Sequence, residues 1–481
     1  MKFLIKIEKS LFYFLSFAFF WQLRLVWQPF GNAFNEWTSA YLYATDIIIV
    51  AILFLWGARV LRDKVKVKCG RPEIFLALFL LIVGASVIFS QNKLLAGYGF
   101  LKLIEFSLLF LYVKYNFSEF YNLKSFWRWF ITGAVLQSAV AINQFFAQKS
   151  LGLKIFAESP LAPNIDGVAK IIVNGEKIVR AYGLVPHPNL LAAILMAAIF
   201  GAAWLLIFSH SESPAGGEES NADRSFPPRL AVKARPGASP FAKTSGDKSL
   251  RMTKNTDYLL SAAVFIFLLS ALFFTFSRGV TVVGLAALVV WLIFVWLKNK
   301  EYRKSVLGIF LLLAIGYSLL AIIYRPYFSA RYDAGAIAGS QAVNLRYFYN
   351  QEALTMIEKN PTLGIGQGNF VHSLMNSDIA NFEPWMAQPV HNIYLLIASE
   401  AGPLGLLAFL LFLFFTIKAA WKYRHNLSES HLLFIVGALL LIGLFDHFLW
   451  DLQQGQILFW LMLGILASCS FSDQAESGPR S

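Results

Sequence analysis

The sequence is poor in charge and nearly free of cysteine. Only 14% of its 481 residues are charged and 57% are hydrophobic, whereas a soluble domain carries about 25% charged residues. This composition excludes a soluble globular protein. The two cysteines, Cys69 and Cys469, fall in segments expected to face the cytoplasm, so we expect neither a disulfide nor a cysteine metal site.

The chain also lacks the usual signatures of metal-dependent and nucleotide-dependent chemistry. It has no His-Glu-X-X-His motif and no Asp-X-Asp pair in the expected outer segments, so we predict no metal site and no cofactor. The segment Gly364-Ile-Gly-Gln-Gly368 shares only its glycines with nucleotide loops, because no strand precedes it and no Lys-Ser/Thr follows it. The net charge of +13 lies mostly between apolar runs, which argues against a nucleic-acid partner.

Apolar runs of about 20 residues recur along the chain, and each is long enough to cross a membrane as a helix. The sequence therefore predicts an all-α polytopic membrane protein that forms a single transmembrane domain over residues 1–481. From hydropathy and length we expect about twelve transmembrane helices, at roughly 11–27, 40–57, 73–90, 95–113, 126–147, 188–208, 257–276, 279–297, 305–324, 393–417, 431–449 and 455–471.

Basic residues gather in loops that fall on one side of this topology. They follow the second, eighth and tenth expected helices: Arg59, Arg62, Lys64, Lys66, Lys68 and Arg71; Lys298, Lys300, Arg303 and Lys304; Lys418, Lys422 and Arg424. The positive-inside rule makes that side cytoplasmic. We therefore expect a multi-pass protein of the cytoplasmic (inner) membrane, in contact with membrane lipids, with both termini in the cytoplasm.

Three longer segments stand out between the apolar runs. Residues 209–256 are rich in Ser, Pro, Gly and Ala, a composition that favours a disordered linker, here on the cytoplasmic side. Residues 148–187 and 325–391 are expected as loops on the outer side, and long loops between closely spaced helices are usually functional. Within the larger outer loop the apolar spacing predicts an amphipathic helix over Ala342–Lys359, which Asn360-Pro361 should end.

Two arginines mark the outer ends of expected helices. Almost nothing separates two apolar runs at Thr275–Gly279, which predicts a tight hairpin with Arg278 at its tip. Arg278 could bind a phosphate in bidentate fashion or reach the lipid headgroups by snorkelling, and both interpretations stay open. Arg180 lies just before another expected helix, where His187 and Asn189 could contact a substrate or simply cap that helix.

The large outer loop adds two further candidates. Arg346 lies near the start of the expected loop helix, and His391-Asn392 ends the loop at the edge of the next apolar run. A solvated arginine and an interfacial histidine cap are the structural alternatives for these positions. Farther into that run, Glu400 is expected to line an internal polar cavity, as buried charges in membrane proteins commonly do.

In their order and spacing, these motifs resemble the O-antigen ligase/polymerase superfamily of bacterial membrane proteins, which act in surface-polysaccharide assembly. The resemblance covers roughly residues 180–410 and rests on the whole series rather than on one motif. The series comprises Arg180…Gly183…His187-Pro-Asn189, Ser277-Arg278-Gly279, Arg346, Asn360-Pro…Gly364-Ile-Gly-Gln-Gly-Asn-Phe370, His391-Asn-Ile-Tyr-Leu-Leu and Glu400-Ala-Gly-Pro-Leu-Gly405.

The resemblance implies a membrane glycosyltransferase fold of the GT-C-like type with a large, partly helical outer loop. It also implies metal-independent transfer of a glycan from undecaprenyl diphosphate to an acceptor hydroxyl at the outer face, in the synthesis of lipopolysaccharide or another cell-envelope polysaccharide. The acceptor could be a glycan, a lipid or a protein. By their positions in the motifs, Arg278 and Arg346 would bind the diphosphate with Arg180 as a helper, and His391 would be the catalytic residue.

Physical chemistry supports these roles. A diphosphate leaving group gains negative charge as the glycosidic bond breaks, so fixed cations stabilise the transition state more than the ground state. A neutral histidine can accept the proton of the attacking hydroxyl, and a single displacement would invert the anomeric centre. His187, Asn189, Asn392 and Glu400 are the candidates for supporting roles.

Alternatives remain open for the function. Within the superfamily the protein could be a polysaccharide polymerase or a protein O-oligosaccharyltransferase. From a different class, a transporter or flippase for lipid-linked oligosaccharides would suit about twelve helices, but such proteins are often built from internal repeats around a site near the membrane midplane. The sequence shows no evident repeat, and its candidate groups gather at the outer surface. The enzyme hypothesis requires that Arg278, Arg346 and His391 converge on one outer cavity.

Overall fold

The protein is a multi-pass membrane protein built mainly of helices. A computed structural model describes residues 2–30, 34–64, 69–208, 242–333, 341–377 and 386–469. Within these residues the long helices are α1 (Lys2–Ala18), α2 (Ala44–Asp63), α3 (Arg71–Phe89), α4 (Lys93–Phe120), α5 (Leu123–Ala147), α6 (Pro188–Phe208), α7 (Ala242–Phe274), α8 (Arg278–Lys298), α9 (Arg303–Ile323), α14 (Ile393–Trp421), α15 (Leu427–Ile442) and α17 (Gln453–Ser468). Every segment that was expected to cross the membrane overlaps one of these helices.

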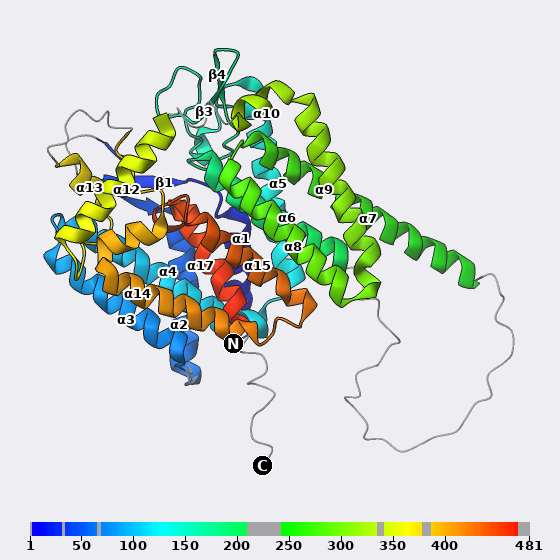
Figure 1. Ribbon diagram of the computed structural model, residues 1–481. Helices are drawn as coiled ribbons and strands as arrows, with labels where there is room; N and C mark the ends of the chain where they lie inside the picture. The colour runs from blue at the N-terminus through cyan, green and yellow to red at the C-terminus, as the bar shows by residue number, and fades with distance from the viewer. Residues whose placement is uncertain are drawn as a thin grey trace, which may run out of the picture.

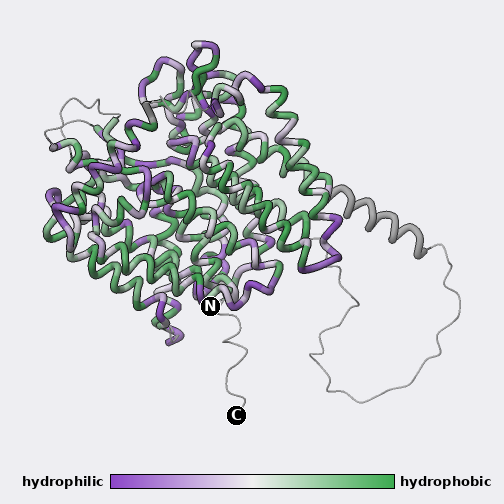
Figure 2. Tube along the Cα trace, viewed as in Figure 1, coloured by the Kyte–Doolittle hydropathy of each residue, from purple (hydrophilic) through white to green (hydrophobic). Residues whose placement is uncertain are grey.

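In the described part of the chain, eight helices are long and apolar enough to cross a membrane. Two further apolar helical segments are shorter, Tyr258–Phe274 of α7 and the whole of α15. Figure 2 shows hydrophobic residues along the bundle and hydrophilic residues gathered toward its ends. The bundle therefore has the hydropathy profile of a polytopic membrane domain.

The remaining helices and the strands cap one end of this bundle. They are the helices α10 (Arg325–Tyr332), α12 (Gln341–Lys359), α13 (Phe370–Met375) and α16 (Phe448–Asp451), the 3₁₀ turns η1 (Glu36–Thr38) and η2 (Lys154–Phe156), and the strands β1 (Arg24–Pro29), β2 (Ser39–Tyr43), β3 (Lys170–Val173) and β4 (Glu176–Val179). A third 3₁₀ turn, η3 (Lys300–Tyr302), separates α8 from α9. Figure 1 shows β3, β4, α10 and α12 at the end of the bundle opposite the start of α1.

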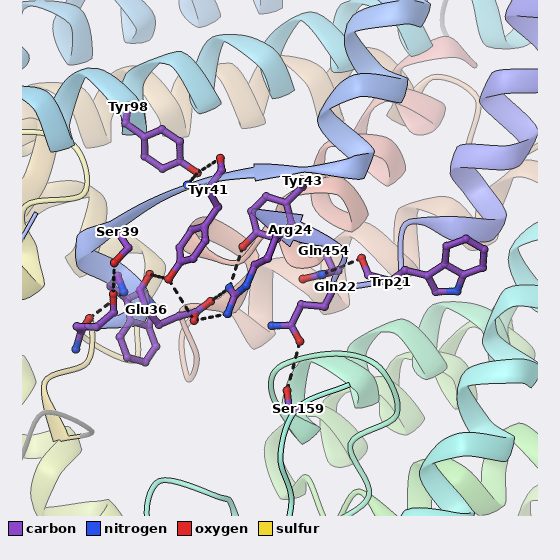
Figure 3. A network of polar contacts seen from close by, with 12 residues as sticks. Trp21, Gln22, Arg24, Glu36, Ser39, Tyr41, Tyr43, Tyr98, Ser159 and Gln454 are labelled. Carbon is purple, nitrogen blue, oxygen red and sulfur yellow. Dashed lines mark hydrogen bonds and ion pairs between the residues drawn. The ribbon is translucent and has the colours of Figure 1, made fainter. Parts of the chain in front are cut away.

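The prediction of a first transmembrane helix at 11–27 is wrong over its second half. Helix α1 ends at Ala18, and Arg24–Pro29 forms strand β1, which pairs with β2 in antiparallel fashion. The reason is a side-chain network that hydropathy cannot detect (Figure 3): the guanidinium of Arg24 donates hydrogen bonds to the Glu36 carboxylate, with NH2 2.8 Å from Oε2, and lies over the Tyr41 ring. A paired arginine is stable at the surface of the bundle, where it need not enter lipid. The two small sheets also correct the expectation of a purely α fold.

The predicted linker at 209–256 is wrong in its last part. Helix α7 begins at Ala242, so residues 242–256 are helical, whereas residues 209–241 lie outside the described residues. The outer segment at 148–187 contains η2 and the β3–β4 hairpin. The segment at 325–391 contains α10, α12 and α13, and the observed α12 begins one residue before the helix predicted from the apolar spacing.

Helix α6 forms the centre of the bundle. Nearly all of its side chains are buried, against α5, α7, α8 and α15. Small residues permit this close packing, since a Cβ placed on Gly201 would lie 2.3 Å from the indole of Trp127. The amino end of α6 is therefore held rigidly at the capped end of the bundle, and it carries Asn189 there.

The glycine-rich turn after α12 lies directly on helix α14. The backbone N–H groups of Ile365 and Gly366 donate to the carbonyl oxygens of Ser399 and Glu400, both at 2.9 Å. Gly364, Gly366 and Gly368 all have positive φ, a conformation that suits glycine. On the helix side, Gly402 has φ 74° and interrupts α14 just before Pro403. This contact fixes the large loop to the bundle.

Replacing Gly402 with alanine is expected to destabilise the protein. A Cβ at this position would lie 2.1 Å from the carbonyl oxygen of Thr362, and the positive φ adds strain of about 1–3 kcal/mol. The thermal unfolding midpoint in detergent should therefore fall. Gly437→Ala in α15 is the matched control, because nothing lies within 4 Å of its Cβ position. A Gly402→Ala protein as stable as the control would contradict the close backbone contact.

Candidate functional site

A cavity of about 520 Å³ opens at the capped end of the bundle. That size lies within the range of small-ligand sites, about 300–1,000 Å³. Its wall combines basic groups with apolar side chains from the ends of α8 and α15. The polar and charged lining residues are Lys170, Arg180, His187, Asn189, Ser277, Arg278, Arg331, Arg346, Tyr349, Gln388, His391 and Asp446. Four arginines thus face one space.

Arg180 is the most buried of these arginines and is fixed by its neighbours. Its Nε donates to the carbonyl oxygen of Thr275 at 2.6 Å, and its NH2 donates to Oδ1 of Asn189 at 2.7 Å. The amide Nδ2 of Asn189 in turn donates to Asp446 at 2.6 Å. Burial lowers the pKa of Arg180 to about 10, so the guanidinium is still charged at neutral pH. This series of hydrogen bonds joins the α7–α8 turn, α6 and the segment that follows α15.

Arg278 and Arg331 tie the α7–α8 turn to α10. The Arg278 guanidinium donates to the carbonyl oxygen of Arg331 at 3.1 Å, and Nε of Arg331 donates to the carbonyl oxygen of Phe276 at 2.9 Å. Burial, together with the neighbouring arginines, lowers the pKa of Arg331 to about 9. The two side chains use only part of their donors in these contacts, so the remaining N–H groups can face an anion in the cavity.

Arg346 differs from the other three arginines because its side chain is exposed. It lies on α12 and lines the cavity. Among the described residues, its guanidinium has no hydrogen-bond or ion-pair partner. Burial is the main cause of the low pKa of His391, and the charge of Arg346 adds to it; the same charge helps to lower the pKa of Asp446. An exposed, unengaged arginine at a cavity mouth is free to bind an incoming anion.

His391 lies on the cavity wall immediately before α14. Its ring is stacked parallel to Tyr349, with centroids 5.8 Å apart and planes at 6°. Asn392 caps α14 by accepting hydrogen bonds from the N–H groups of Tyr394 and Leu395. Burial, together with His447, holds the pKa of His391 well below its usual value. The imidazole is therefore neutral at physiological pH, and its Nδ1 has no partner among the described residues.

Two acidic residues, Asp446 and Asp451, lie close to His391 and His447. Burial alone would raise the pKa of Asp446, but the surrounding histidines and Arg346 hold it at about 2. The ring of His447 meets that of His391 at 90°, with centroids 4.8 Å apart. Nδ1 of His447 lies 2.9 Å from Oδ1 and 2.7 Å from Oδ2 of Asp451. Burial lowers the pKa of His447, but Asp451 and Asp446 outweigh that effect and raise it.

His391, Asp446 and His447 could hold a metal by spacing alone, since one ligand atom from each lies within 4.8 Å of the others. The donor set fits a metal poorly. Nδ1 of His447 is engaged by Asp451, both Asp446 oxygens accept hydrogen bonds, and the positive charge of Arg346 lies close by. The same three groups fit proton transfer better, because a carboxylate beside a neutral histidine stabilises the imidazolium that forms. The sequence did not predict this cluster.

The structure brings six of the residues predicted from sequence to one cavity: Arg180, His187, Asn189, Arg278, Arg346 and His391. His187 accepts a hydrogen bond from the N–H of Asn189 through Nδ1, and burial lowers its pKa to about 3. It acts as a helix cap. Asn392 and Glu400 do not line this cavity.

Sequence reasoning missed Arg331, Asp446 and His447 as site residues. Arg331 had a weak signal, because it is a further cation in the large outer loop. Asp446 and His447 carried a clearer one, since two charged or titratable residues follow an apolar run directly. Their partners lie on segments remote in sequence, so only the fold reveals their role.

Residues 263–410 match the O-antigen ligase family. This confirms the resemblance that the motifs indicated. The matched range contains Arg278, Arg331, Arg346 and His391, whereas Arg180 and Asp446 lie outside it. Among curated proteins, none matches the chain.

Proposed function

We propose that this protein, whose residues 263–410 match the O-antigen ligase family, moves a glycan from undecaprenyl diphosphate to an acceptor hydroxyl. The observation that carries this proposal is the shared cavity of Arg180, Arg278, Arg331, Arg346 and His391. A cluster of arginines provides fixed forks of N–H donors that match the oxygens of a diphosphate. A neutral histidine in the same wall provides a base within reach of the bound substrate.

We place this cavity at the outer face of the cytoplasmic membrane. The topology that supports the placement has twelve spanning helices in one transmembrane domain, 1–481, of the GT-C-like type, with both termini inside. The basic loops after α2, α8 and α14 then face the cytoplasm, together with the segment 209–256. The loop segments 148–187 and 325–391 lie outside, where both contribute to the wall of the cavity.

In the proposed reaction the arginines act on the leaving group. The acceptor oxygen bonds to the anomeric carbon as the bond from that carbon to the phosphate oxygen breaks, and the electron pair leaves with the diphosphate. Arg278 and Arg346 stabilise this growing negative charge, with Arg331 beside them. Arg180 is already held by Thr275 and Asn189. We therefore propose that its fixed positive charge stabilises the leaving group electrostatically, without a direct contact.

His391 accepts the proton of the acceptor hydroxyl. Its low pKa keeps it neutral and ready for this step, and the ionised Asp446 stabilises the imidazolium that results. Attack on the face opposite the diphosphate inverts the anomeric centre. No step requires a metal ion. A ligase, a polymerase and a protein O-oligosaccharyltransferase share this chemistry and differ only in the acceptor.

A reconstituted transfer reaction tests the proposed function. The purified protein in detergent is mixed with undecaprenyl-diphosphate glycan and, separately, with a lipid-linked glycan, a lipid A core and a serine-rich protein as acceptors. We expect transfer to one of the three with stoichiometric release of undecaprenyl diphosphate, undiminished by EDTA. Activity lost in EDTA and restored by zinc would reassign His391, Asp446 and His447 to a metal site. Absence of transfer to all three would contradict the proposal.

The pH dependence of kcat/KM reports the protonation of His391. A base must be neutral, so activity is present above its pKa and lost as the pH falls through it. Because that pKa lies well below 6.5, we expect a flat profile at neutral pH and an acid limb below pH 6.5. The positive charge on His447 is one cause of the low pKa. His447→Gln should therefore raise the pKa of His391 and move the acid limb to higher pH.

His372→Gln is the matched control for this profile. His372 lies on α13 outside the cavity and pairs with Asn376, so the profile should not change. An acid limb that stays in place in His447→Gln, or moves to lower pH, would contradict the electrostatic coupling between His391 and His447.

A further inference from the structure

A second, smaller cavity of about 100 Å³ adjoins the first. The β1–β2 hairpin, the outer ends of α4 and α14, the glycine-rich turn and the start of α17 form its wall. The lining side chains that bear on its chemistry are Glu36, Trp37, Tyr98, Gln367, Asp451 and Gln453. Figure 3 shows how Tyr98 and Glu36 join this region through Tyr41. Its size limits an occupant to about one sugar ring.

The segment that carries His391 separates the two cavities. Gln388 lines the first cavity and its neighbour Pro389 lines the second. Behind them, the ring of His447 lies 4.8 Å from that of His391 and 5.7 Å from that of Trp37, measured between centroids. His391 therefore lines the first cavity, and His447 lies between it and Trp37 of the second cavity.

The two cavities differ in charge. Four arginines and Lys170 line the first cavity, against the single carboxylate of Asp446. Three carboxylates line the second, from Glu36, Glu400 and Asp451, together with the cation Lys102. Glu36 is paired with Arg24, and Asp451 is paired with His447. Lys102 is already neutralised, because its Nζ lies 2.6 Å from Asp46 and 2.7 Å from Glu105. The second cavity therefore offers a phosphate no unpaired cation, whereas a hydroxyl could donate to its carboxylates.

Buried polar atoms in the second cavity lack partners. The side-chain oxygens of Gln367 and Gln453 have none among the described residues, and these side chains are only 7% and 3% exposed. The indole N–H of Trp37 is also buried and has no partner among the described residues. A buried polar atom that lacks a hydrogen-bond partner costs free energy. Hydroxyl groups can satisfy both donors and acceptors of this kind. Aromatic lining residues such as Trp37 and Tyr98 suit the C–H faces of a sugar ring.

We infer that the second cavity binds the acceptor as a phosphate-free sugar residue, with one hydroxyl directed past His447 toward His391. This inference rests on the proposed function, which supplies the donor to the first cavity. The arginines of the first cavity would then hold the donor diphosphate, and the unpartnered polar groups of the second would hold the acceptor sugar. Gln367 and Trp37 are specificity residues for the acceptor, and they make no contact with the donor.

Sugar binding in the absence of donor tests this assignment. Saturation-transfer NMR measures the binding of a panel of neutral methyl hexosides and N-acetylhexosaminides to the full-length protein, and calorimetry measures the binding of inorganic pyrophosphate. In Gln367→Met, which keeps the side-chain length, we expect sugar affinity to fall about three- to tenfold, the effect of one lost hydrogen bond, with pyrophosphate binding unchanged. Trp37→Leu should act in the same way.

Two controls complete the design. Gln351→Met changes an exposed amide on α12 outside both cavities and should alter neither ligand, whereas Arg346→Gln should weaken pyrophosphate alone. Absence of sugar binding to the wild-type protein would overturn the inference, as would sugar binding that Arg346→Gln weakens and Gln367→Met does not. Either result leaves the proposed transfer intact, while sugar binding without any transfer would contradict the proposed function alone.

Discussion

Replacing His391 with alanine is expected to lower kcat for glycan transfer by about 10²–10⁴-fold, the usual contribution of a general base. The loss follows from the removal of the neutral imidazole that faces the cavity between Tyr349 and His447. Binding of pyrophosphate should change little, because the arginines that hold the diphosphate remain in place. The measurement is the initial rate of transfer at saturating donor and acceptor.

His372→Ala is the matched control for this loss. It removes a histidine of the same loop that does not line the cavity, and its kcat should equal that of the wild type. His391→Gln separates chemistry from packing, since it retains a polar side chain of similar reach but cannot accept a proton in this way. Should His391→Gln retain full activity, the role of base would pass to another group.

Replacing Arg346 with glutamine is expected to lower kcat by about 10²–10³-fold, which is the typical cost of losing one donor that stabilises the transition state. Arg346 is the arginine best suited to this test, because its side chain is exposed and its guanidinium has no hydrogen-bond or ion-pair partner among the described residues. Arg346→Lys keeps the charge but loses the bidentate geometry, so its loss should be smaller. The same initial-rate measurement compares the variants.

Arg325→Gln provides the control for charge alone. Arg325 begins α10 in the same loop and is exposed, but it does not line the cavity. We expect its kcat to stay near that of the wild type. Equal losses in Arg325→Gln and Arg346→Gln would mean that the rate depends on the net charge of the loop rather than on a placed guanidinium.

The sequence predicted the helices and the polar loop between them with good accuracy, since both depend on local patterns. Apolar spacing placed a helix over Ala342–Lys359, and the structure has Gln341–Lys359. The exception is instructive. Residues 19–27 are apolar enough to extend a spanning helix, but Arg24 binds Glu36 and the chain forms a strand. A hydropathy profile does not take into account an ion pair with a residue twelve positions away.

The candidate site was predictable only where a motif carried it. Arg278, Arg346 and His391 stood out by their positions at the ends of apolar runs, and the structure brings them to one cavity. Asp446 could not be assigned, because its role depends on contact with Asn189, which lies 257 positions away in the sequence. Glu400 was expected near the site, but it binds the N–H of Phe370 and faces the second cavity.

The most direct test of the central claim distinguishes a transferase from a transporter in one preparation. Proteoliposomes carry undecaprenyl-diphosphate glycan in both leaflets and an acceptor outside, and the glycan attached to acceptor and the lipid that crosses the bilayer are measured together. We expect the acceptor to be glycosylated in wild-type vesicles and unmodified in those with His391→Ala, with no protein-dependent crossing of lipid in either. Lipid crossing without any glycosylated acceptor would contradict the claim.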